Sequence, residues 1–200
     1  MDASTNTIIA GEYGVSEFSI PQLYAFLQPL KRRGLTPFSC TIDGNPHVYK
    51  VLKELWPDII IQRCMVHIQR QGLSWCRRFP KRTDAKHLRN LFKQVCYINN
   101  HQEQYQFMLQ LRRFEYRFGR DIEMQPGKGK VFSDLKKARS MLVKAVPHMF
   151  HYLDNASIPR TTNALEGYYS RLKERYRQHR GLTRDKLRSY FNWFFYLKPM

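Results

Sequence analysis

Acidic residues are scarce in this sequence, and the scarcity is uneven along the chain. The 200 residues include 16 Asp and Glu against 34 Lys and Arg, a net charge of +18. Residues 1–60 carry six acids and five bases, whereas the other 140 residues carry ten acids and 29 bases. Solubility needs a net charge of only about 2–8, so the excess indicates a surface that binds a polyanion. Nucleic acid is the favoured partner, and on charge alone an RNA-binding protein remains open.

Other absences exclude whole classes of protein. No apolar run reaches the roughly 18 residues that a membrane span needs, and the N-terminus has no basic segment followed by an apolar one, as a signal peptide would. The four cysteines have no framework spacing, which indicates thiols in a reducing cytosol. An apolar fraction of 42% with 14% aromatics argues against disorder. We therefore expect one large or two small globular domains without a membrane span.

The first third of the chain has the alternating pattern of an α/β sheet. Apolar runs bounded by turn residues predict strands over residues 7–14, 37–44 and 58–67. Apolar residues at helical spacing predict helices over residues 16–33, ended by Gly34, and over residues 47–57. The order β-α-β-α-β is typical of an α/β fold.

From residue 68 to 150 the pattern is almost wholly helical, with one expected stripe running from Tyr105 to Tyr116 through Met108, Leu109 and Arg112. Between these helices, "QPGKGK" (125–130) lacks the context and spacing of a phosphate-binding loop, so we expect a flexible basic loop. A helix follows Pro159, and a last helix is expected over 184–197. We therefore expect the chain to divide into three segments: residues 1–67 with the alternating strands and helices, residues 68–150 with the helical stretch, and residues 151–200 with the last helices.

Asp43 is the first candidate for chemistry, because it ends the apolar strand in "CTIDGN". Functional groups of α/β proteins collect at the carboxyl ends of sheet strands. The alternative is structural, since Asp-Gly-Asn is also ordinary turn chemistry.

Glu166 is the second candidate, in "TTNALEGYYSRLKERYRQHRGL". As a structural residue it would be the third-position partner of an Asn163 N-cap. At helical spacing, however, Asn163, Glu166, Ser170, Lys173 and Arg177 share one polar face. That face sets a carboxylate in line with two cations, as the handling of a phosphodiester requires.

Cysteine and histidine offer a possible zinc site. Cys64 and His67 are closely spaced, and His148 and His151 are the only second pair that could complete four ligands. The alternative is that Cys64 and His67 pack beside the end of the sheet.

Taken together, "TIDG", the following "WP", "QRCMVH", the helical stretch and "PRTTNALEG" resemble the DDE transposases of the Mutator-like group of bacterial insertion sequences. The resemblance implies a ribonuclease-H-like catalytic core with a large all-helical insertion. It matches Asp43 to the second catalytic aspartate and Glu166 to the catalytic glutamate. It also matches Cys64 and His67 to a Cys-x-x-His element, and Thr162 and Asn163 to the Thr-Asn-x-x-Glu motif.

This resemblance implies metal-dependent DNA strand cleavage and strand transfer, with Mg²⁺ or Mn²⁺ held by Asp43 and Glu166. Lys173, Arg177 and Arg180 would contact phosphates of double-stranded DNA, both transposon ends and target. A homo-oligomer in the active complex and a place on the bacterial nucleoid, in the cytoplasm, are implied as well. The alternative function is a basic DNA- or RNA-binding protein without catalysis, and a weaker one is a zinc-stabilised RNA-binding module.

One departure from the family pattern concerns its first aspartate, which lies on a central first strand. Only about one and a half strands are expected before the helix at residue 16, and Asp2 stands near the end of what resembles the second strand. Asp2 is therefore not expected to replace the first aspartate. The expectation is a transposase that lacks its first catalytic strand and is inactive.

Overall fold

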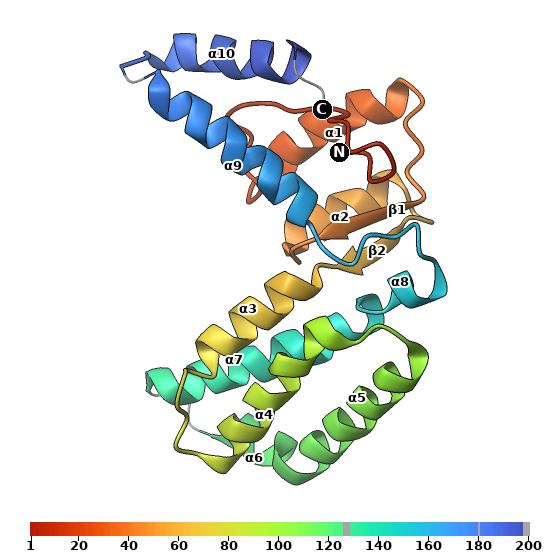
Figure 1. The fold of residues 1–200 in the computed structure, drawn as a ribbon, viewed down its shortest axis with the longest axis vertical. Coiled ribbons are helices and arrows are strands. Elements are labelled where there is room, and N and C mark those ends of the chain that lie inside the picture. The colour runs from red at the N-terminus through yellow and green to blue at the C-terminus, as the bar shows by residue number, and fades with distance from the viewer. Residues whose placement is uncertain (126–128, 180, 198–200) are drawn as a thin grey trace. The chain divides into compact units, whose positions relative to one another are not determined.

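The computed structural model describes residues 1–125, 129–179 and 181–197 (Figure 1). They form a mostly helical structure with one small sheet. The elements are α1 (Ile20–Arg32), β1 (Ser39–Ile42), α2 (Pro46–Leu55), β2 (Ile60–Arg63), α3 (Met65–Trp75), α4 (Thr83–Gln94), the 3₁₀-helix η1 (Val95–Tyr97), α5 (His101–Phe114), the π-helix η2 (Glu115–Gly119), α6 (Arg120–Met124), α7 (Lys130–Ala145), the 3₁₀-helix η3 (Val146–His148), α8 (His151–Asp154), α9 (Asn163–Gln178) and α10 (Arg184–Leu197).

The chain divides into two compact units. The first unit joins two distant segments, Met1–Ile61 and Ser157–Met200. The second unit is the single segment Gln62–Ala156 between them.

The sheet consists of the parallel strands β1 and β2, connected through α2. The N–H of Ile60 donates to the carbonyl of Phe38 at 3.0 Å, just before β1. Apolar residues of both strands, of α1, of α2 and of the connection from α2 to β2 pack into the core of the first unit: Leu23, Ile42, Val51, Leu52, Leu55, Trp56, Ile59 and Ile61. The strand-helix-strand order predicted over residues 37–63 is confirmed, and it places the end of β1 beside the start of α2.

Local chemistry fixes the bounds of α1 and α2. Pro21 stands in the first turn of α1, where a missing N–H costs nothing, and the helix begins at Ile20 rather than at residue 16. Gly34 has a φ of +91°, so the predicted glycine stop after α1 is confirmed. The side chain of Asn45 caps α2 by accepting from the N–H groups of His47 and Val48.

The strand predicted over residues 7–14 is wrong, because this segment is irregular in the structure. A strand needs a hydrogen-bonded neighbour, and the segment instead packs on α10. The Tyr13 ring stacks on Phe191 with centroids 4.7 Å apart. Gly11 lies so close to Phe195 that a Cβ there would be 2.7 Å from the ring.

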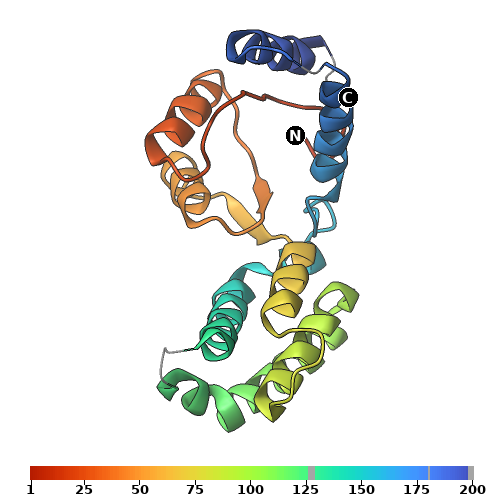
Figure 2. The ribbon, with the colours of Figure 1, turned by 90° about the vertical axis from the view of Figure 1, so that its left-hand side faces the viewer.

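The second unit is built mainly from helices (Figure 2). These helices pack around an apolar core of their own. Predominantly helical structure over residues 68–150 is confirmed. The stripe expected on α5 is wrong: Tyr105 is 61% and Tyr116 95% exposed, whereas Phe107, Leu111 and Phe114 are buried. Phe107, Leu111 and Phe114 recur at helical spacing and form a face without polar atoms. The expected stripe includes a charged Arg112 and two tyrosines, so the wholly apolar face takes the interior position.

Two further expectations differ from the structure or fall outside it. The strand predicted over residues 58–67 ends at Arg63, and Met65 already begins α3. Residues 126–128 of the expected loop at 125–130 lie outside the described residues. In the part of the chain that is described, no helix combines the length and hydropathy needed to cross a bilayer.

Candidate nucleic-acid interface and metal site

Asp43 lies where β1 ends, as predicted, and its side chain is exposed. Its Oδ1 accepts a hydrogen bond from the N–H of Asn45 at 3.0 Å, which is the turn geometry of the structural alternative. Gly44, between them, has a φ of +104°, so the chain turns sharply away from the strand. The carboxylate is thereby held at the carboxyl end of the sheet, immediately before the first turn of α2.

A side-chain hydrogen bond joins this strand to the segment that leads into α9. The Thr41 hydroxyl donates to the carbonyl of Pro159 at 2.5 Å, across 118 residues of sequence. Thr41 lies two residues before Asp43, and Pro159 lies seven residues before Glu166. The end of β1 and the approach to α9 are therefore held together within the first unit.

Glu166 lies in the first turn of α9 and is half-buried. Thr162, not Asn163, is the N-cap residue, and its side chain does not cap the helix amides. Instead the Thr162 hydroxyl donates to Oε1 of Glu166 at 3.1 Å. The capping arrangement considered as the structural alternative for Asn163 and Glu166 is therefore not formed, because the helix begins one residue earlier than that arrangement requires.

The polar face predicted for α9 is exposed. Asn163, Ser170, Lys173 and Arg177 lie in solvent, whereas Tyr168 and Leu172 on the neighbouring face are buried. Arg180 lies outside the described residues. Lys173 and Arg177 extend along the helix from the turn that holds Glu166, as a track for a phosphate backbone would.

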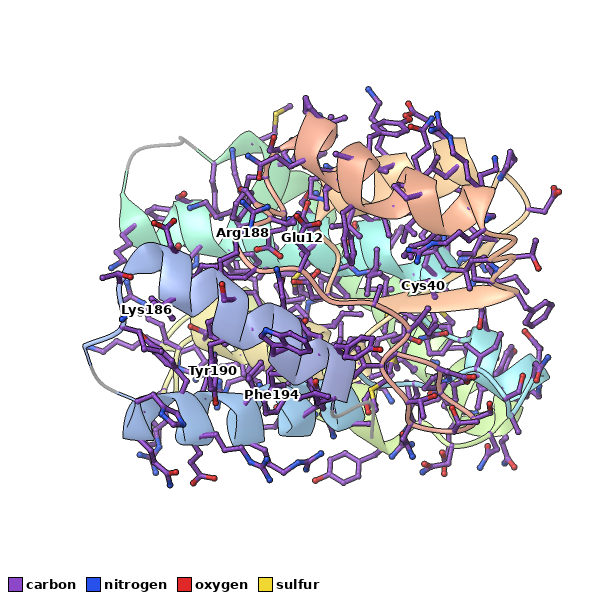
Figure 3. The ribbon with its side chains drawn as sticks, turned by 90° about the horizontal axis from the view of Figure 1, so that it is seen from above. Glu12, Cys40, Lys186, Arg188, Tyr190 and Phe194 are labelled. Carbon is purple, nitrogen blue, oxygen red and sulfur yellow. The ribbon has the colours of Figure 1, made fainter. Side chains whose placement is uncertain are left out.

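Aromatic side chains hold the buried face of α9 against α10. Figure 3 shows Tyr190 and Phe194 of α10 on the side toward α9. The Tyr176 ring lies 6.4 Å from that of Tyr190, and the Tyr168 ring lies 5.8 Å from that of Phe194. The Arg175 guanidinium lies 5.9 Å from the centre of the Phe194 ring, so this arginine also joins the two helices.

Cys64 and His67 lie at the start of α3, in the second unit. Cys64 is the buried N-cap residue, and its Sγ lies within 4.8 Å of a ring nitrogen of His67. His148 and His151 are neighbours, with ring centroids 6.3 Å apart. All four of these residues are described, and no three of them bring their ligand atoms within 4.8 Å of one another. The four-ligand zinc arrangement is therefore not assembled in this structure.

Two residues that shape this region, Thr41 and Asn45, were not predicted from the sequence. Thr41 has no signal in the sequence, since the partner of its hydroxyl lies 118 residues away. Asn45 could have been found, because an Asn directly before a Pro at the start of an apolar periodic stretch is an N-cap signal. Its Nδ2 also donates to the carbonyl of Glu17 at 3.2 Å, which attaches the turn after Asp43 to the segment before α1.

The comparisons with known proteins agree with the resemblance seen in the sequence. No curated protein and no solved structure is significantly similar to the chain. The profile of the family described as "Transposase, Mutator family" matches residues 16–182, which include β1, the whole helical unit and α9. The chain therefore belongs to the Mutator family of transposases.

Proposed function

We propose that this transposase cuts and joins DNA strands with a metal-dependent active site in which Asp43 and Glu166 are ligands of Mg²⁺ or Mn²⁺. The observation that supports it is the hydrogen bond from Thr41 to the Pro159 carbonyl. That bond links the strand that ends at Asp43 to the segment that enters α9 three residues before Glu166. A strand end and a helix start would each contribute one carboxylate to a ribonuclease-H-like core.

The residues fit the metal by their chemistry. Carboxylate oxygens are the ligands that Mg²⁺ prefers, and it usually takes one or two of them along with waters and phosphate oxygens. Bound on either side of the scissile phosphate, two such ions would activate water or a 3′-hydroxyl and stabilise the leaving oxygen. Asp43 would hold its carboxylate in place through the Asn45 N–H, and Glu166 through the Thr162 hydroxyl.

The cations of α9 would position the DNA. Lys173 and Arg177 are exposed on the face that also bears Glu166, and Arg180 would extend the same track. Phosphate contacts of this kind fix the register of a duplex without reading its sequence. We propose that transposon ends and target DNA are both held in this way, in a homo-oligomeric complex on the bacterial nucleoid.

Direct metal binding tests the assignment. In Mn²⁺ titration calorimetry, Asp43→Asn and Glu166→Gln should each weaken binding at least tenfold, because each removes a charged ligand. Both variants should keep the parent's affinity for duplex DNA in EDTA. Glu174→Gln is the matched control, since Glu174 is an exposed acid on the same helix. Unchanged Mn²⁺ affinity in the Glu166 variant, with only the stability loss of about 0.5–1.5 kcal/mol that one hydrogen bond contributes, would assign Glu166 a structural role.

Cleavage is the second measurement. We propose that strand cleavage depends on both metal ligands, so Asp43→Asn and Glu166→Gln should each abolish any cleavage that the parent shows. The assay uses Mn²⁺ and a substrate that carries the element's own ends. Robust 3′-end cleavage by either variant would contradict the proposal.

A DNA-binding protein without catalysis is the second candidate. It is favoured by the contacts of the two carboxylates, since Asp43 closes a turn and Glu166 accepts from Thr162. In that case both metal-ligand variants would retain whatever Mn²⁺ affinity the parent has.

A further inference from the structure

The loop between α3 and α4 is strongly basic and carries an exposed aromatic ring. Its sequence from residue 77 to 82 is "RRFPKR", with four cations in six residues. Arg77, Arg78 and Lys81 are exposed, and Phe79 is 81% exposed. We name these residues, 77–82, the RRFPKR loop.

The charges of this loop are not balanced by nearby acids in the sequence. Asp84 is the only acid between residues 59 and 102. It is buried and accepts from Arg82 through both carboxylate oxygens, at 3.1 and 2.6 Å. Arg77, Arg78 and Lys81 therefore present a positive surface.

Both ends of the RRFPKR loop are anchored to helices. Before it, Cys76 is buried, and its N–H donates to the carbonyl of Gly72 at 2.9 Å. Arg77 has a φ of +61°, a conformation uncommon for a residue other than glycine, and its N–H donates to Ser74 O at 3.2 Å. After it, the Arg82–Asp84 pair fixes the start of α4. The two ends of the loop are thus fixed before any partner arrives, which lowers the entropy cost of binding.

The exposed ring of Phe79 lies among the cations of the loop. The Arg78 guanidinium lies 5.3 Å from its centre. A singly exposed apolar side chain needs no explanation. An aromatic ring within a cluster of arginines and lysine, however, has the composition of a nucleic-acid contact, in which cations bind phosphates and rings stack on bases.

We propose that the RRFPKR loop is a second DNA contact, in which Arg77, Arg78 and Lys81 bind phosphates of a duplex and Phe79 inserts against its bases. Apolar side chains that insert at a base step partly unstack it and bend the duplex. This inference rests on DNA as the substrate of the proposed function, and it adds a contact in the helical unit that the α9 track does not include. In this proposal the loop stabilises the bent duplex, and the carboxylates of Asp43 and Glu166 do not contribute to the bending.

The test uses the full chain in EDTA with a duplex of about 30 base pairs that carries 2-aminopurine, whose fluorescence rises when the base unstacks. The parent should raise the fluorescence, and Phe79→Ala should abolish the rise and weaken binding about 5- to 100-fold, as loss of one stacked base does. Its salt dependence should not change, since no charge is removed. Replacing Arg77, Arg78 and Lys81 together by Gln should reduce the slope of log K against log salt by about three, roughly one for each lost phosphate contact.

Tyr116→Ala is the matched control, because Tyr116 is a 95% exposed ring in the same unit outside the loop. It should behave as the parent does. If the parent binds DNA but the Phe79 and triple variants match it in affinity, fluorescence and salt slope, the assignment of the loop is wrong while the proposed function stands. If the parent binds no DNA even at low salt, both fail. Circular dichroism melting of each variant shows whether a loss arises from unfolding.

Discussion

Phe92 of α4 fills the space that a side chain on Gly72 of α3 would occupy. A Cβ on Gly72 would lie 2.2 Å from the Phe92 ring, and Phe92 itself is fully buried. The two helices approach closely there only because residue 72 has no side chain. This contact lies in the middle of the apolar core of the second unit.

Gly72→Ala should therefore destabilise the second unit by about 1–3 kcal/mol, the usual cost of overpacking a core. Gly167→Ala is the control, since its Cβ would meet only Arg171 Nη1 at 3.7 Å, an ordinary contact. In a helix the control substitution should be neutral or stabilise by about 0.5–1 kcal/mol. Urea unfolding followed by circular dichroism measures both, and equal stability of the two variants would show that α3 and α4 can separate at no cost.

Asp84 should stabilise the fold in a pH-dependent way. Burial alone favours its neutral form, but hydrogen bonds from Arg82 and from the Ala85 N–H outweigh burial, so its pKa lies below the ordinary value. A lowered pKa in the folded state contributes stability above the unfolded pKa of about 3.9, and this stability is lost as the pH falls through the folded value. Asp84→Asn should cost about 1–3 kcal/mol at pH 7, and the difference from the parent should shrink near pH 3.

Asp121→Asn, in an exposed acid of the same unit, is the control for Asp84. It should follow the parent at both pH values in urea unfolding. A cost for Asp84→Asn that is the same at pH 7 and pH 3 would contradict a role for its charge.

Cys76 should be almost inert to alkylation in the folded protein. Burial raises the pKa of its thiol to about 12. At pH 8 the reactive thiolate is then about 10³-fold scarcer than for an ordinary thiol with a pKa near 8.5. Iodoacetamide labelling resolved by peptide mass spectrometry should find Cys76 modified only after denaturant is added. Rapid labelling of Cys76 under native conditions would mean that the end of α3 opens readily.

DNA binding should weaken steeply with salt, because 29 of the 34 basic residues follow residue 60. If six to ten phosphates are neutralised, the affinity for a duplex of arbitrary sequence should fall about 10³- to 10⁵-fold between 50 and 200 mM salt. Fluorescence anisotropy over this range gives the slope. An affinity that does not respond to salt would exclude an electrostatic DNA surface.

Local signals in the sequence predicted most of the elements, and contacts between distant residues account for the failures. Gly34 ends α1 as expected, and α10 has the bounds that were predicted, 184–197. The strand expected over residues 7–14 failed because its apolar residues pack on α10, almost 180 residues away in sequence. On α5 two adjacent apolar faces competed, and only the packed structure decides for Phe107 and against Tyr105.

In the candidate site, too, the features set by local sequence were predicted and the contact between distant residues was not. The turn after β1 and the position of Glu166 in the first turn of a basic helix follow from local patterns. The Thr41–Pro159 hydrogen bond does not, because neither residue carries a sign of the other. The N-cap was misplaced by one residue, which is the usual precision of a helix start read from sequence.

The discontinuity of the first unit has a consequence for synthesis. All the residues of the second unit leave the ribosome in one uninterrupted run, so we expect that unit to fold as a piece during translation. The first unit cannot complete its fold until Pro159 and α9 have been synthesised, because Pro159 follows its hydrogen-bond partner Thr41 by 118 residues. A chain that is still being translated would thus carry a folded second unit, with its RRFPKR loop, before Asp43 and Glu166 belong to one folded body. On this order of events, the proposed DNA contact of the helical unit would form before the two proposed metal ligands come together.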